Sequence, residues 1–140
     1  MSERGQPGET IAGRYLVRRG WTIVVRNWSG AGGELDIVAL RAGVLAFVEV
    51  KSRADASELD DPVRYGQRGR MINAARLFVA LHPKFAGMSA RFDVIAIDMS
   101  RRWRRADHIA DAFEMDESVD TPPSPKSRNS GYATERNDRR

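Results

Sequence analysis

Two segments of the chain carry apolar residues at the three- and four-residue spacing of a helix. In the first, Pro7–Arg19, Ala12 and Leu16 share a face with Glu9, and Gly20 follows as a stop signal. The second, Arg64–His82, ends before Pro83. The expected buried face of this second helix consists of Met71, Ala75 (or Ala74), Phe78 and Leu81. The pattern therefore predicts two amphipathic helices, one at each end of a central region.

The central region and the segment after the second helix are rich in β-formers. The predicted strands are Trp21–Arg26, Glu34–Arg41, Val44–Lys51 and Arg91–Asp98, with a short closing element at His108–Phe113. The glycine-rich run 29–33 is expected to be a turn, residues 52–62 a polar loop, and Ala42-Gly43 a two-residue hairpin turn. The order is αβββαβ. Because the second helix joins two strands as a parallel crossover, we expect a mixed α/β sheet flanked by helices.

The last segment of the chain differs from the rest. From Glu117 to Arg140 the only apolar side chains are Val119, Tyr132 and Ala133, among prolines, serines and charged residues. Such a segment buries too little apolar surface to offset its ordering entropy. We therefore predict one folded domain over residues 1–116 and a disordered tail over residues 117–140.

The amino-acid composition excludes several kinds of functional site. The chain has 140 residues, no cysteine and two histidines, which excludes thiolate sites and argues against a histidine-rich metal site. No apolar run approaches the roughly 20 residues of a membrane span, and the first residues are polar, so a cytoplasmic protein is expected. The formal net charge of +4, nearly all from arginine, fits a polyanionic partner without establishing one.

Face counting across the predicted hairpin brings two acids together. With Ala42-Gly43 as the turn, paired residue numbers sum to 85, so Asp36 falls opposite Glu49 and Glu34 opposite Lys51. Two carboxylates about 4 Å apart repel by roughly 4 kcal/mol at a dielectric of 20. A shared proton, the Lys51 cation, or a divalent ion such as Mg²⁺ can offset that repulsion. Lysine can also hold a water nucleophile, which arginine does poorly.

Each of these residues also has a plainer interpretation. Glu9 can serve as a first-turn cap, since a carboxylate is favoured at a helix N-terminus. Asp36 and Glu49 can be a solvated surface pair, and Lys51 can simply pair with Glu34. The Arg-Arg-Trp-Arg-Arg run at 101–105 can be a solvated turn or can grip phosphates, with Trp103 stacking on a base.

At these positions the chain resembles the YraN-like bacterial proteins, an uncharacterised family of proposed endonucleases. The matching stretches are Gly8-Glu9-x-x-Ala12 with Tyr15-Leu16, Asn27-Trp28, Gly33-Glu34-Leu35-Asp36-Ile37-Val38-Ala39, Phe47-Val48-Glu49-Val50-Lys51, Arg91-Phe92-Asp93-Val94, and His108-Ile109 with Ala112-Phe113. That family is similar to Holliday-junction resolvases and to the wider PD-(D/E)xK nucleases. The resemblance implies a restriction-endonuclease-like fold in which Glu9, Asp36 and Glu49 hold Mg²⁺ or Mn²⁺ and Lys51 orients the attacking water.

The resulting hypothesis is a metal-dependent nuclease that hydrolyses phosphodiester bonds of DNA, including branched DNA, with RNA not excluded. Two rivals stay open: a catalytically silent nucleic-acid-binding module on the same fold, and a protein-interaction adaptor. The resolvase resemblance also suggests a homodimer. Residues at the start of the second helix are candidate phosphate contacts, although many family members carry lysine in place of the glutamine: Arg64, Gln67, Arg68 and Arg70.

Overall fold

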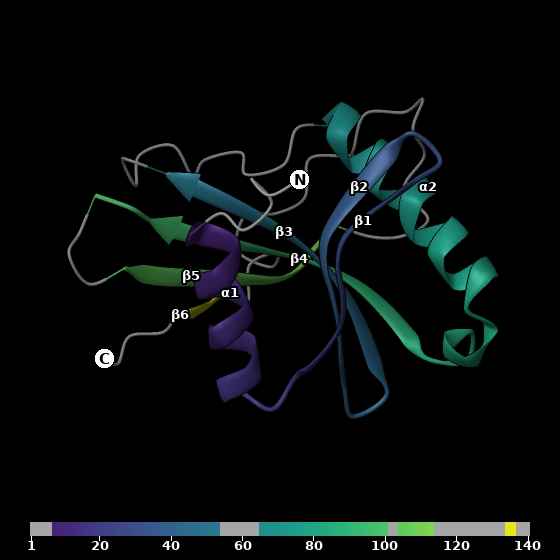
Figure 1. Cartoon of the computed structure of the whole chain (residues 1–140), viewed down its shortest axis with the longest axis horizontal. Coiled ribbons are helices and arrows are strands. Elements are labelled where there is room, and N and C mark those ends of the chain that lie inside the picture. The colour runs from purple at the N-terminus through teal and green to yellow at the C-terminus, as the bar shows by residue number, and fades with distance from the viewer. Residues whose placement is uncertain (1–6, 54–64, 101–103, 114–133, 137–140) are drawn as a thin grey trace.

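The computed structural model describes residues 7–53, 65–100, 104–113 and 134–136 of the chain. The described residues form one six-stranded mixed sheet with helices packed against it, as Figure 1 shows. The helical elements are α1 (Pro7–Arg18), α2 (Tyr65–Leu81) and the 3-10 turn η3 (Pro83–Phe85). The strands are β1 (Thr22–Gly30), β2 (Gly33–Arg41), β3 (Val44–Arg53), β4 (Ser89–Asp98), β5 (Arg105–Phe113) and β6 (Thr134–Arg136), hydrogen-bonded in that order.

The predicted hairpin and its register are confirmed. Strands β2 and β3 pair antiparallel with Arg41 opposite Val44 and Val38 opposite Phe47, so that paired numbers sum to 85. The turn residues Ala42 and Gly43 both have positive φ, 49° and 78°. Positive φ at both central positions is the geometry that a twisted two-residue hairpin needs.

The first hairpin is longer than the sequence indicated. Strand β1 continues to Gly30 and β2 begins at Gly33, so only Ala31 and Gly32 form the turn that was expected to span 29–33. Both turn residues again have positive φ, 53° and 80°. Glycines at the ends of paired strands are therefore part of the ladder here, because Gly30 pairs with Gly33.

The crossover through α2 makes the sheet mixed, as predicted. Strand β3 pairs parallel with β4 over its whole length, from Val44–Ser89 to Arg53–Asp98, whereas the other neighbours are antiparallel. A parallel partner requires a long connection, and α2 supplies it. The expected αβββαβ order is confirmed, and β5 follows as an antiparallel strand over Arg105–Phe113, longer than the predicted closing element.

Two apolar cores cover the two faces of the sheet. Side chains that alternate along β3 separate them: Leu45 and Phe47 pack with Phe78 of α2, whereas Ala46 and Val48 pack with Leu16 of α1. The predicted burial of Leu81 is wrong, because that side chain is 59% exposed. Leu81 is the last residue of α2 and is followed by η3, whereas Phe78, at the start of the same turn, is buried in the core.

One described piece of the predicted tail departs from the expectation of disorder. Thr134–Arg136 forms strand β6 and pairs antiparallel with β5 through Ile109, His108 and Asp107. A strand edge offers unpaired backbone groups, and three polar residues suffice to pair with it. The rest of residues 117–140 lies outside the described part, and the domain boundary at 116 stays a prediction. Among the described helices, none is long and apolar enough to cross a membrane.

Candidate active site

A hollow of about 360 Å³ lies where the β2–β3 strands meet the first turns of α2. Its lining brings together three of the chain's hairpin acids and two of the predicted phosphate contacts. The lining residues are Gly32, Gly33, Glu34, Asp36, Glu49, Gln67, Arg70 and Met71. The predicted gathering of Asp36 and Glu49 in one place is therefore confirmed.

Asp36 is held by the backbone of the neighbouring strand. The regular β2–β3 ladder ends at the Ile37–Val48 pair, and beyond it Asp36 Oδ2 accepts a hydrogen bond of 2.8 Å from the Val50 N–H. The two acids are therefore neighbours across the strands, as face counting predicted, although they are not partners in the regular backbone ladder. The carboxylate satisfies an N–H group that the diverging strands leave without a ladder partner.

Glu49, Lys51 and Gln67 form a closed triangle of polar contacts. Lys51 Nζ lies 3.3 Å from Glu49 Oε2 and donates to Gln67 Oε1 at 3.1 Å, while Gln67 Nε2 donates to Glu49 Oε2 at 2.8 Å. Glu49 and Lys51 share a strand face by alternation, and α2 lays Gln67 across that face. The side chains of Glu49 and Lys51 are only 10% and 18% exposed, so the lysine is held in place rather than swinging in solvent.

Burial raises the pKa of both acids, and neighbouring carboxylates add to the increase. Desolvation and the Glu49 carboxylate raise the pKa of Asp36 to about 7, against the opposing effect of the Val50 hydrogen bond; Glu9 and Glu34 add to the increase. The pKa of Glu49 is also raised by burial, although Lys51 and Gln67 favour its charged form. Near neutral pH this pair therefore holds a proton or needs a cation.

Glu9 lies close enough to Asp36 to affect it, although it comes from α1 rather than from the hairpin. It lies in the first turn of α1, and a Cβ added at the preceding Gly8 would collide with Ser52 Oγ at the end of β3. Glycine thus allows the helix N-terminus to approach the strand closely. The Glu9 carboxylate is near enough to raise the pKa of Asp36, although Glu9 does not line the hollow.

The donor set suits a hard divalent cation. Mg²⁺ binds carboxylate oxygens and commonly takes only one or two protein carboxylates, keeping water in its other positions. Asp36 and Glu49 supply two such oxygen donors, and a cation would offset the negative charge of Glu49 that helps to raise the pKa of Asp36. Within residues 7–53, 65–100, 104–113 and 134–136, no three His, Asp or Glu side chains are grouped closely enough to form a metal site by themselves. From the described residues alone, an ion held here would have this acid pair and water as ligands.

Three of the four candidate phosphate contacts lie in the described part of the chain, and each has different surroundings. Gln67 belongs to the triangle with Glu49 and Lys51, and Arg70 is an exposed side chain at the hollow. Arg68 instead lies over the Phe113 ring, with its guanidinium carbon 5.4 Å from the ring centroid. Arg64, like residues 101–103 of the basic run, lies outside the described residues.

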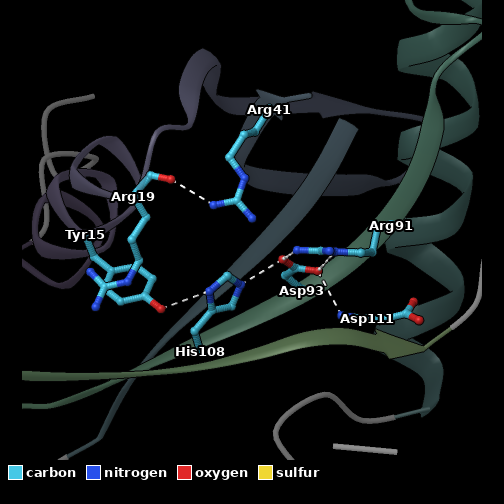
Figure 2. A network of polar contacts seen from close by, with 7 residues as sticks. All are labelled: Tyr15, Arg19, Arg41, Arg91, Asp93, His108 and Asp111. Atoms are coloured by element: carbon cyan, nitrogen blue, oxygen red, sulfur yellow. Dashed lines mark hydrogen bonds and ion pairs between the residues drawn. The ribbon is translucent and has the colours of Figure 1, made fainter. Parts of the chain in front are cut away.

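A second polar network, which sequence reasoning did not find, is buried on the α1 face. Asp93 is fully buried and accepts two hydrogen bonds of 2.9 Å from Arg91, one of 2.8 Å from His108 Nε2 and one of 2.9 Å from the Asp111 N–H. Figure 2 shows these contacts, and the bond of 3.1 Å between His108 Nδ1 and the Tyr15 hydroxyl that ties β5 to α1. The sequence does contain one signal for this network, because strand alternation puts Arg91 and Asp93 on the same face of one strand.

Burial alone would raise the pKa of Asp93, but the bonds from His108, Arg91 and Asp111 together hold it below its ordinary value. This acid stays ionised and internally paired, in contrast to Asp36 and Glu49. Both ring nitrogens of His108 take part in this network, Nε2 with Asp93 and Nδ1 with Tyr15.

The fold and the site together define a mixed α/β protein with two raised-pKa acids and a fixed lysine at one corner of its sheet. The chain belongs to the uncharacterised protein family UPF0102, whose sequence profile matches residues 8–97, from the start of α1 to the end of β4. A UPF0102 protein of Granulibacter bethesdensis is 42% identical over 116 residues, covering 83% of this chain and 72% of the relative. A UPF0102 protein of a Synechococcus strain is 36% identical, and the match covers 82% of this chain and 94% of the relative. A UPF0102 protein of Treponema pallidum is 40% identical, and the match covers 79% of this chain and 91% of the relative.

Proposed function

We propose that this protein is a divalent-metal-dependent nuclease that hydrolyses phosphodiester bonds of DNA. The observation that carries the proposal is the raised pKa of Asp36 and Glu49 beside a lysine fixed by two contacts. Perturbed acids in a hollow are typical of functional sites. The resemblance to PD-(D/E)xK nucleases supports the same chemistry. The proposal also includes a cytoplasmic location and assembly of the chain into a homodimer.

Each side chain has a definite role in this mechanism. Asp36 and Glu49 would hold Mg²⁺ or Mn²⁺, with Glu9 adding negative charge behind them. When bound, the ion would stabilise the negative charge that develops on the phosphate during hydrolysis. Lys51 Nζ, fixed between Glu49 and Gln67, has a third donor hydrogen with which to align a water molecule. Arg70 at the hollow offers a guanidinium to a phosphate.

One observation favours the binding module as a second candidate. The two acids are already engaged within the protein, Asp36 by the Val50 N–H and Glu49 by Gln67 and Lys51. A protein that used these acids only to join its strands would need no metal and would cleave nothing. The nuclease therefore requires the carboxylates to accept a cation without losing the fold.

The test is cleavage of four-way, linear and single-stranded DNA, and of RNA, with Mg²⁺ or Mn²⁺ against EDTA. We expect metal-dependent cleavage by the native chain and none by Glu49→Ala. Mn²⁺ binding, followed by the rise in melting temperature of the free protein, gives a readout independent of activity. Binding of nucleic acid without cleavage under any metal would favour the module, and neither binding nor cleavage would favour the adaptor.

A further inference from the structure

A second hollow, of about 190 Å³, lies on the α1 side of the sheet and is strongly basic. Of the lining residues that the structure describes, none belongs to both this hollow and the acidic one. Its lining residues are Ile11, Arg14, Tyr15, Arg18, Arg19, Arg104 and Ala106. Among these seven described residues four are arginines and none is acidic, so this part of the lining concentrates positive charge.

Two of these arginines, Arg14 and Arg18, repel one another on the exposed side of α1. Arg14 and Arg18 are four residues apart on α1, and like charges at that spacing destabilise a helix by about 0.2–0.5 kcal/mol. Cations near the C-terminus of α1 would complement its dipole, but this accounts only for its last turn. Arg14 lies a turn earlier, and Arg104 comes from beside β5. Helix α1 and the residue that precedes β5 thus both contribute arginines to the lining of this hollow.

The base of the hollow is fixed by the buried network around Asp93. Tyr15 lines the hollow, and its hydroxyl is bonded to His108, which in turn is bonded to Asp93. The Arg19 guanidinium lies over the Tyr15 ring at 4.1 Å from the centroid, an arrangement visible in Figure 2. The backbone carbonyl of the same arginine accepts a bond of 2.8 Å from Arg41.

Arg104 is also held in position, because its Nη1 donates to the Met99 carbonyl at 2.6 Å. Arg19 and Arg104 are therefore oriented by contacts within the protein, while Arg14 and Arg18 are exposed on the helix. A guanidinium that is oriented in advance loses less entropy when it binds an oxyanion. Planar donors around a concave space suit a tetrahedral oxyanion such as phosphate.

We propose that this hollow, formed by Arg14, Arg18, Arg19 and Arg104, binds a phosphate group of a nucleic-acid backbone. The site is distinct from the acidic hollow, needs no metal and does not depend on the proposed nuclease activity. A backbone phosphate is favoured over a free one, because Arg14 and Arg18 repeat along the exposed side of α1 and can track successive charges of a polymer. Nucleic acid bound here contacts the α1 face of the protein.

The test measures affinity for a fluorescent duplex by anisotropy in EDTA, so that cleavage plays no part. The Arg14→Gln/Arg18→Gln double variant should weaken binding about tenfold and reduce the salt slope of log K by about two. The matched control is Arg76→Gln/Lys84→Gln, which removes the same two charges from exposed positions on α2 and η3. It should change affinity less than about threefold.

Equal losses in the two double variants would overturn the proposal, because the effect would then be one of net charge. A second arm measures melting temperature in inorganic phosphate against chloride of equal ionic strength. If phosphate stabilises the native chain but not Arg14→Gln/Arg18→Gln, while duplex affinity matches the control, the hollow takes a free anion and the nucleic-acid assignment is wrong.

Discussion

Asp36 accepts a backbone hydrogen bond from Val50, two residues beyond the last regular pair of the β2–β3 ladder. The side-chain carboxylate of Asp36 therefore accepts the hydrogen bond that a backbone carbonyl accepts elsewhere in the sheet. The bond fixes the acid against β3, 14 residues away in sequence, and brings it beside Glu49. The same residue thus joins two strands and contributes half of the acid pair.

Removing the charge of Asp36 should stabilise the metal-free protein. The amide oxygen of Asp36→Asn still accepts from Val50, but the repulsion with Glu49 is gone, so we expect a gain on the order of 1–2 kcal/mol at pH 8. At pH 4 the gain should vanish, because the native carboxyl is then protonated. Urea unfolding in EDTA at both pH values measures this. A loss of stability at pH 8 would show that the charge itself holds the strands together.

The raised pKa of Asp36 also predicts a pH dependence of the native chain. Between pH 4 and pH 7 the unfolded Asp36 has lost its proton while the folded one, with a pKa of about 7, retains it. The folded state then binds more protons, so the contribution of Asp36 to stability falls as pH rises through this window. Mn²⁺ should reverse the trend, since it binds the deprotonated form. A Mn²⁺-induced rise in melting temperature that does not increase with pH would contradict this.

Lys51→Arg separates positioning from charge. Arginine keeps the positive charge, but its longer planar group cannot occupy the place of Nζ between Glu49 and Gln67. A displacement of about 1 Å can reduce a rate about 100-fold. We expect DNA affinity and Mn²⁺ binding to persist while cleavage falls by about that factor, with Lys84→Arg as the control. Cleavage at the native rate would rule out a water-positioning role for Lys51.

Gly33→Ala should disturb the junction between β2 and α2. A Cβ at this position would collide with the backbone carbonyl oxygen of Arg70, and backbone cannot rotate away as a side chain can. We expect a loss of about 2–3 kcal/mol. Gly43→Ala is the control, because Gly43 has open space around it and its positive φ costs an alanine only about 1 kcal/mol of backbone strain. Chemical denaturation distinguishes them, and equal losses would show that α2 can shift to accommodate the methyl group.

The buried network on the α1 face should be sensitive at Asp93 and tolerant at Tyr15. Asp93→Asn replaces the buried acid of the ion pair with Arg91 by a neutral amide, and losing hydrogen bonds to a charged group costs about 1.5–3 kcal/mol. Tyr15→Phe removes one neutral hydrogen bond, worth about 1 kcal/mol. Urea unfolding at pH 7 compares the two. A larger loss of unfolding free energy for Tyr15→Phe would contradict this, because the tyrosine hydroxyl would then contribute more stability than the Asp93 carboxylate.

Two truncations measure what β6 contributes. Deleting residues 137–140 leaves the β5–β6 pairing intact and should not change the melting temperature. Deleting residues 117–140 removes the partners of Asp107, His108 and Ile109, and we expect a loss of about 1 kcal/mol. Identical melting temperatures for the two truncated chains would mean that β6 adds no stability, as the composition of the tail alone predicts.

The sequence by itself determined the features that depend on short-range periodicity. Alternation within strands and a two-residue turn at Ala42-Gly43 set the β2–β3 register, and this register places Asp36, Glu49 and Lys51 together. The helical spacing of Ala12 and Leu16 likewise identified the buried face of α1. These inferences succeed because the side-chain direction at each position follows from its neighbours along the chain.

Only the tertiary structure decided how distant segments meet. Packing of α2 on the sheet placed Gln67 between Glu49 and Lys51 and left Leu81 in solvent. Pairing of β4 with β5 brought His108 to Asp93, and packing of α1 brought Arg14 and Arg18 near Arg104. No local period encodes these contacts, because each depends on the angle and distance at which whole elements dock, and those follow from the packing of the complete core.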